Sequence, residues 1–133
     1  MPDSPVQILH ADAPKFRVGV VGLGNAGTTH MKAFSKHPQT ILAAIAGKEI
    51  DRLPILAQEL KVATTASDWE TLVEDPTIDI ISIATPNSLH HPIARAALSA
   101  GKHVFCEKPL SITADQAQEM VSTAKANNRI LEV

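Results

Sequence analysis

The chain has 133 residues, a length that suits one ordinary domain with its own hydrophobic core. A net charge of −2 with 20% charged residues gives no sign of a nucleic-acid or acidic-membrane partner, and 3% aromatic residues argue against a stacking surface for single-stranded nucleic acid. The longest apolar runs are far shorter than a bilayer span, so we expect no membrane partner either.

Residues 1–15 read MPDSPVQILHADAPK and differ in character from the rest of the chain. Their prolines and polar residues predict a loose N-terminal extension. The stretch has neither the basic n-region nor the apolar h-region of a signal peptide. The single cysteine, Cys106, cannot form an internal disulfide bond, which fits a reducing compartment. We therefore expect a cytoplasmic protein.

From residue 16 onward, short apolar runs alternate with segments of helical periodicity. In chain order we expect strand 16–21, helix 26–37, strand 40–46, helix 49–60, strand 62–64, helix 67–73, strand 78–84, helix 87–100, strand 102–106, helix 113–127 and strand 129–133. Capping boxes open the helices at Ser67 and Thr113, and Gly101 is placed as the residue that ends a helix. Pro54 is tolerable only in the first turn of its helix.

The predicted strands lack polar alternation and are separated by helices, a pattern typical of a parallel sheet covered on both faces. Right-handed crossovers then give an α/β fold, a doubly wound parallel sheet (Rossmann fold), as a single domain over residues 16–133. The expected strand order is 3-2-1-4-5-6, with a ligand crevice between strands 1 and 4.

The sequence Gly22-Leu23-Gly24-Asn25-Ala26-Gly27 has the pattern G-x-G-x-x-G, directly after a predicted strand and at the start of a predicted helix. In that setting Gly22 permits the tight turn, Gly24 lets a pyrophosphate approach the backbone, and Gly27 lets the helix pack close to the strand. The helix N-terminus offers free N–H groups to the phosphates. A glycine-rich loop without a ligand is the alternative.

The end of the second predicted strand indicates which dinucleotide is bound. An NAD site has a carboxylate about 20 residues beyond the glycine turn, but Gly47 and Lys48 occupy that place, and the nearest acid is Glu49. A small residue followed by a cation suits a 2′-phosphate, and Arg52 lies one helical turn further on. We therefore expect NADP, with NAD as the alternative. The two cations could also be a solvated helix start.

Because parallel strands end on the same edge, three loops should converge there: 22–27, 85–91 and 107–109. The last contains Glu107 and Lys108, which could otherwise be a solvated pair. Neighbouring residues on a helix point about 100° apart, so His90 and His91 cannot both face one ligand, and we expect one to be solvated. No set of residues has metal-ligand spacing. Cys106 is expected to be a buried strand residue, and His30 to pack or bond locally.

The motifs GLGNAGTTH, ATPNSLHH and CEKPL together resemble the N-terminal half of the glucose–fructose oxidoreductase / inositol dehydrogenase / MocA family, over residues 16–133. The resemblance implies an NAD(P)-dependent oxidoreductase that moves a hydride between a nicotinamide and a carbinol carbon of a sugar, polyol or related compound. It places Lys108 at the reacting oxygen as a catalytic residue. The implied cofactor contacts are Leu23, Asn25, Ala26, Gly47, Lys48, Ala84, Thr85, Pro86, Asn87, His90, Glu107 and Lys108.

In that family a second α/β domain follows, supplying further substrate residues and an oligomer interface, and it is absent from this chain. The resemblance therefore implies a cofactor-binding domain with little or no turnover alone, a small-molecule substrate and a homo-oligomeric full-length protein. A non-catalytic dinucleotide-binding regulatory or sensor module is the alternative, and an interaction domain without any ligand is the third.

Overall fold

A computed structural model of the chain describes residues 15–133. All but the last residue of the expected N-terminal extension lie outside the described residues. The core of the structure is one parallel six-stranded sheet in the order β3-β2-β1-β4-β5-β6, as the sequence predicted. The strands are β1 (Phe16–Val21), β2 (Thr40–Ala46), β3 (Thr64–Ala66), β4 (Ile80–Ile83), β5 (His103–Cys106) and β6 (Leu131–Glu132).

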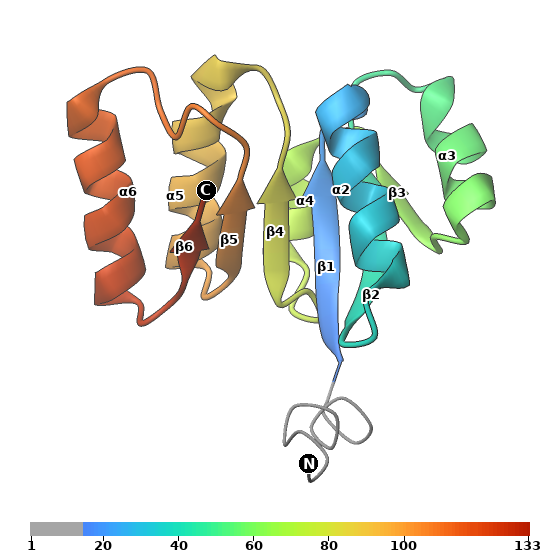
Figure 1. The fold of residues 1–133 in the computed structure, drawn as a ribbon, viewed down its shortest axis with the longest axis horizontal. Helices are drawn as coiled ribbons and strands as arrows, with labels where there is room; N and C mark the ends of the chain where they lie inside the picture. Colours follow the sequence, from blue (N-terminus) through green and yellow to red (C-terminus); the bar gives the residue numbers. More distant parts are fainter. Residues whose placement is uncertain (1–14) are drawn as a thin grey trace, which may run out of the picture.

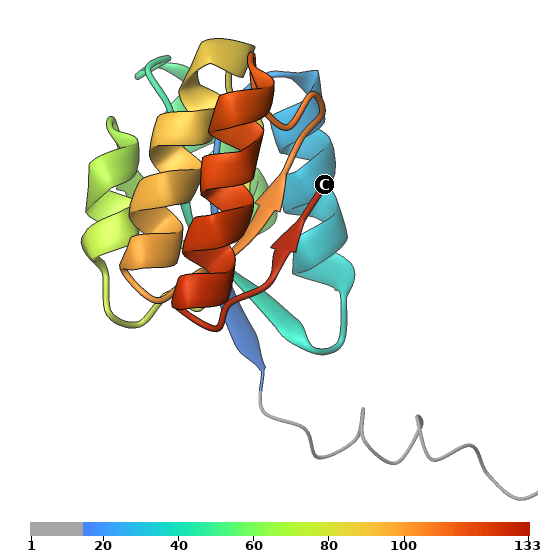
Figure 2. The same ribbon diagram turned by 90° about the vertical axis from the view of Figure 1, so that its left-hand side faces the viewer.

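Helices cover both faces of this sheet (Figures 1 and 2). They are α2 (Asn25–Lys36), α3 (Arg52–Leu60), α4 (Trp69–Glu74), the 3₁₀ turn η1 (Asn87–Leu89), α5 (His90–Ser99) and α6 (Ala114–Ala126). Helices α2 and α3 lie on one face, and α4, α5 and α6 lie on the other. The carboxyl ends of the strands meet along the upper edge in Figure 1, so the loops that follow them gather there.

Two hydrophobic clusters hold these layers together, one on each face of the sheet. On one face, Val18, Val20 and Ile45 pack with Met31 of α2 and Leu53 of α3. The larger cluster packs the other sheet face against α4, α5 and α6; its members include Ile81, Ile83, Ile93, Leu98 and Met120. Burial on both faces explains why the strands show apolar runs rather than alternation.

The third strand begins later than the sequence predicted. We expected residues 62–64, but β3 spans Thr64–Ala66. Lys61 takes the left-handed conformation at the end of α3, with φ of 57°, and the Val62 N–H donates to Ala57 O at 2.8 Å. Val62 therefore belongs to the helix end, where it is buried. Its β-branched side chain suits a core contact as well as a strand, which is why the pattern misplaced it.

The structure tests the predicted helix ends individually. The Thr113 side chain accepts a hydrogen bond from the Gln116 N–H, as its capping box predicted. In α4 the cap is Asp68 rather than Ser67, because the Asp68 carboxylate accepts the Thr71 N–H at 3.0 Å. Gly101 follows α5 with a φ of +84°, as expected for a residue that ends a helix.

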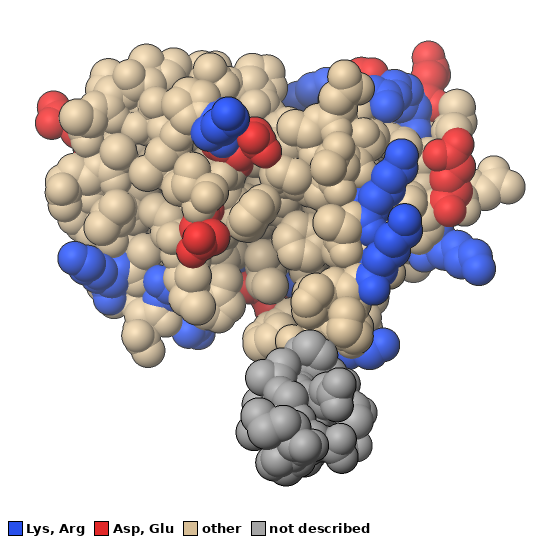
Figure 3. Space-filling model, viewed as in Figure 1, with Lys and Arg blue, Asp and Glu red and all other residues tan. Residues whose placement is uncertain are grey.

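The charged surface is mixed on the face shown in Figure 3. Basic side chains gather over α2 and α3, and acidic side chains lie among them. Within the described residues, no helix is both long and apolar enough to cross a bilayer.

Candidate functional site

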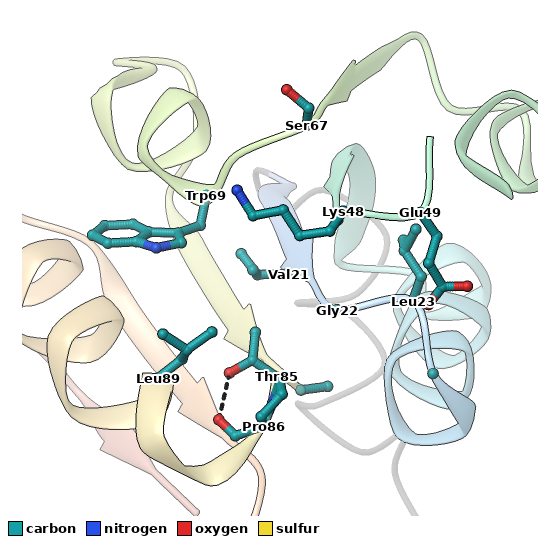
Figure 4. Close-up of a pocket in the computed structure, with 13 residues that line it drawn as sticks. Val21, Gly22, Leu23, Lys48, Glu49, Ser67, Trp69, Thr85, Pro86 and Leu89 are labelled. Carbon is teal, nitrogen blue, oxygen red and sulfur yellow. Dashed lines mark hydrogen bonds between the residues drawn. The ribbon is translucent and has the colours of Figure 1, made fainter. Parts of the chain in front are cut away.

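A pocket of about 420 Å³ opens at the carboxyl edge of the sheet (Figure 4). Of the three loops expected to converge, those after β1 and β4 contribute to its wall, whereas residues 107–109 after β5 do not line it. The loops after β2 and β3 also contribute to the wall. The predicted site residues that line it are Gly22, Leu23, Gly24, Gly47, Lys48, Ala84, Thr85 and Pro86. The predicted residues outside its lining are Asn25, Ala26, Gly27, Arg52, Asn87, His90, Glu107 and Lys108.

The glycine turn packs against the neighbouring strand end. Gly22 has a φ of +112°, and a Cβ there would overlap the Ala84 carbonyl of the β4 loop. A Cβ on Gly27 would overlap the Gly22 carbonyl, so α2 can approach the end of β1 this closely because residue 27 has no side chain. At Gly24, by contrast, a Cβ would have open space around it for 4 Å.

This open space lies at the N-terminus of α2. Gly24 is the N-cap and offers no side-chain acceptor to the first turn of the helix. The first N–H groups of an α-helix have no partners inside the helix, and they carry the positive end of its dipole. The first turn of α2 next to the pocket therefore offers backbone N–H groups without partners inside the helix, beside an uncrowded Gly24, an arrangement that suits a phosphate group.

The loop after β2 supplies one cation to the pocket. In Figure 4 the Lys48 side chain extends toward Trp69, whereas Glu49 points toward Leu23. Glu49 Oε2 lies 3.3 Å from Arg52 Nη1, which also donates to the Leu23 carbonyl at 2.5 Å. Arg52 thus ties the start of α3 to the glycine turn and offsets the charge of Glu49, leaving Lys48 as the cation that lines the pocket.

His90 is not among the residues that line the pocket, and its expected place on the nicotinamide side stays a prediction. Its side chain is fully buried, with Nδ1 2.7 Å from Pro109 O and Nε2 3.0 Å from Thr85 O. His91 is not solvated either, because its Nε2 lies 3.1 Å from Glu119 Oε2 and 17% of its side chain is exposed. The side chains of both histidines therefore bond to other residues of the fold, contrary to the prediction that one of them is solvated.

Glu107 is anchored at the end of β5. Its carboxylate lies 2.8 Å from His30 Nε2, and this hydrogen bond is the main cause that lowers the pKa of Glu107. His30 Nδ1 lies 2.8 Å from Ser82 Oγ, so the contact spans from α2 across β4 to the β5 loop. Lys108 follows and is exposed, and its peptide bond to Pro109 is cis.

Several residues of the site were missed by sequence reasoning. Ser67, Trp69, Glu49 and Leu89 line the pocket. Ser67 and Trp69 follow β3, whose carboxyl end lies on the same sheet edge as the other loops, so the convergence argument could have included them. The contact of His30 with Glu107 joins residues 77 positions apart, and no spacing rule indicates it.

Cys106 is a buried strand residue, as expected. Its thiol is fully buried, and desolvation raises its pKa to about 12, which makes it a poor nucleophile. Among residues 15–133, no three His, Cys, Asp or Glu side chains are grouped so that they could hold a metal ion.

Comparison with known proteins agrees with this geometry. Residues 16–133 match the model of the Gfo/Idh/MocA oxidoreductase family, described as an NAD-binding Rossmann fold. The chain is 36% identical over 115 residues to myo-inositol 2-dehydrogenase of Thermotoga maritima, covering 86% of this chain and 34% of that protein.

Two solved structures are similar in fold as well as in sequence. Levoglucosan dehydrogenase in complex with NADH has a TM-score of 0.81 and 32% identity, covering 88% of this chain and 34% of that one. Biliverdin reductase of Synechocystis sp. PCC 6803, in complex with biliverdin and NADP+, has a TM-score of 0.84 and 35% identity, covering 88% of this chain and 37% of that one. The chain thus spans about a third of the length of these relatives. It belongs to the Gfo/Idh/MocA oxidoreductase family and is the NAD-binding Rossmann-fold domain typical of it.

Proposed function

We propose that this chain binds NADP(H) in the 420 Å³ pocket, with the pyrophosphate at the N-terminus of α2. The observation that carries the proposal is the open space at Gly24 beside the uncapped first turn of α2. A phosphate placed there would accept hydrogen bonds from backbone N–H groups and interact favourably with the helix dipole. The adenosine half would extend toward Gly47 and Lys48, and the nicotinamide half toward Ala84, Thr85 and Pro86.

Two features of the β2 loop favour NADP over NAD. Gly47 stands where an NAD site has its ribose-binding carboxylate, and the position has no room for a side chain beneath Leu23. Lys48 lines the pocket with a cation that can bind a 2′-phosphate. The Lys48 ammonium also contributes to the lowered pKa of Asp68, after the stronger effect of the Thr71 hydrogen bonds, so it already lies near one carboxylate.

In the full-length protein, we propose transfer of a hydride between the bound nicotinamide and a carbinol carbon of a sugar, polyol or related compound. The cofactor supplies the hydride chemistry. Lys108 is the proposed catalytic residue: its exposed ammonium can hydrogen-bond the reacting oxygen and stabilise negative charge that develops on it. The similarity of the chain to a myo-inositol 2-dehydrogenase and to a levoglucosan dehydrogenase supports this substrate class.

The same proposal takes the full-length protein to be a cytoplasmic homo-oligomer. Its support is the family resemblance, together with a cysteine kept as a buried thiol. Light scattering on the full-length protein would test the oligomeric part, and a monomer would contradict it.

Titration of the purified chain with NADPH and NADH, followed by nucleotide fluorescence, tests the cofactor assignment. We expect both to bind and NADPH to bind more tightly. Ligand at about 100 times its Kd should also stabilise the fold by about 2.7 kcal/mol, which a thermal melt can detect. Binding of neither nucleotide would overturn the proposal and favour an interaction domain. Binding without any turnover by the full-length protein on polyols or sugars would favour a regulatory module.

A further inference from the structure

Two buried histidines, one from each face of the sheet, hold the segment that carries Lys108. His30 belongs to α2 and contacts the Glu107 side chain, with 2.8 Å between Nε2 and Oε2. His90 begins α5 on the opposite face and contacts the Pro109 carbonyl, with 2.7 Å between Nδ1 and O. The residues on both sides of Lys108 are therefore fixed, one through its side chain and the other through its backbone.

The hydrogen-bond pattern around His30 defines its role. Its second nitrogen, Nδ1, lies 2.8 Å from the hydroxyl of Ser82, which is fully buried. A serine hydroxyl can donate to Nδ1 while Nε2–H donates to the Glu107 carboxylate, so one neutral tautomer satisfies both contacts. The ring also packs edge-on against Phe105, with centroids 5.1 Å apart. The contacts with Ser82 and Phe105 thus set both the plane of the His30 ring and the direction of its Nε2–H donor.

His90 joins two loops that border the site. Its Nε2 lies 3.0 Å from the carbonyl of Thr85, a residue that lines the pocket, and its Nδ1 contacts Pro109. Both partners are carbonyl oxygens, which only accept. A neutral imidazole has a single N–H, so it can donate to one of these carbonyls, and the imidazolium form can donate to both. In every form the buried ring fills the space between the two loops.

We propose that His30 and His90 are positioning residues that set the place of Lys108 relative to the cofactor pocket. Neither ring is available to a ligand, because all four nitrogens contact protein atoms. They act through Glu107, Pro109 and Thr85. This inference rests on the proposed function, since it assumes that the pocket holds the dinucleotide and that Lys108 acts beside it.

Matched variants of the chain can distinguish an effect of the histidines on the place of Lys108 from an effect on the stability of the fold. His90→Leu removes both contacts of the ring, whereas His90→Asn keeps a donor near the place of Nδ1, toward Pro109. His91→Gln is the control, because His91 is next in sequence but its side chain bonds to Glu119 in α6. His30→Leu and Ser82→Ala make the corresponding comparison on the other face. Ser82→Ala leaves the His30 ring intact and removes the group that orients it.

The readouts are the NADPH dissociation constant and the NMR resonances of the Lys108 amide and of the imidazole nitrogens. We expect His90→Leu and His30→Leu to shift the Lys108 amide resonance and to weaken NADPH binding about tenfold. His90→Asn should restore most of the Lys108 resonance, Ser82→Ala should shift the His30 nitrogens, and His91→Gln should change neither readout.

Unchanged Lys108 resonances and NADPH affinity in folded His90→Leu and His30→Leu chains would overturn the inference. If the leucine variants do not fold, Ser82→Ala decides instead, because it should shift the resonances of the His30 nitrogens and, through Glu107, that of the Lys108 amide. A folded Ser82→Ala chain in which neither resonance moves would overturn the inference. A wild-type chain that binds neither nucleotide would contradict the proposed function instead, while the resonances would still report whether the histidines fix Lys108.

Discussion

Gly47 lies directly against the side chain of Leu23, so that a Cβ at position 47 would overlap Leu23 Cγ and Cδ1. Leu23 cannot simply withdraw, because its side chain is buried and its carbonyl accepts a hydrogen bond from Arg52. Gly47 stands where the ribose-binding acid was expected. Packing against Leu23 therefore favours glycine at this position, in addition to any effect that the residue has on the choice of cofactor.

Alanine at Gly47 and at Gly24 should have opposite consequences. Gly47→Ala forces the overlap with Leu23, and we expect a loss of about 1–3 kcal/mol in the free energy of unfolding. Gly24→Ala meets no atom within 4 Å and has an ordinary extended backbone, so stability should change by less than about 0.5 kcal/mol. NADPH binding should nevertheless weaken about tenfold or more, because the new methyl occupies the open space proposed for the pyrophosphate.

Urea unfolding and NADPH titration of both variants check this pair. The double variant Leu23→Ala with Gly47→Ala is the control, since removing the Leu23 side chain should recover part of the stability lost at Gly47. A Gly24→Ala chain that binds NADPH like the wild type would contradict the placement of the pyrophosphate.

Replacing Lys48 should change the preference between the two nucleotides. We expect Lys48→Gln to weaken NADPH binding about tenfold, the size of one charge-assisted hydrogen bond, and to leave NADH binding nearly unchanged. Parallel titrations with the two nucleotides measure the effect. Lys125→Gln in α6 is the matched control, and equal effects of the two substitutions would show that the charge acts non-specifically.

The anchored carboxylate of Glu107 should contribute to stability in a pH-dependent way. The hydrogen bond from His30 lowers the pKa of Glu107 below its ordinary value of 4.5. A lowered pKa in the folded state means that the contribution is fully present above pH 4.5 and is lost as the pH falls through the folded-state value. Between pH 5 and pH 3 the wild type should therefore lose stability more steeply than Glu107→Gln, as measured by urea unfolding at each pH. Identical slopes would show that the contact does not affect folding.

Cys106 should resist thiol reagents in the folded chain. Burial raises the pKa of the Cys106 thiol to about 12, so almost no thiolate exists at pH 8. We expect labelling by a disulfide reagent to be slow in buffer and rapid in denaturant, followed by absorbance. Fast labelling of the native chain, with its unfolding rate measured in parallel, would contradict the buried placement.

Local patterns predicted most of the fold, because each depends on residues close in sequence. The glycine turn between Val21 and Asn25 and the cap at Thr113 come from short-range chemistry, and the parallel order follows from alternating apolar runs and helical segments. The prediction failed for β3, where Val62 fits a helix end as well as a strand. It failed again at the start of α4, where Ser67 and Asp68 are both good caps and only the backbone geometry chooses between them.

In the candidate site, too, some features could be predicted from the sequence and others could not. The meeting of the loops after β1 and β4 at one sheet edge follows from the sequence, because the ends of parallel strands lie on the same side of the sheet. The roles of the histidines depend on tertiary packing. His90 contacts two carbonyls, and His30 reaches a carboxylate 77 residues later. Such contacts depend on how helices on opposite faces of the sheet pack, which no local spacing specifies.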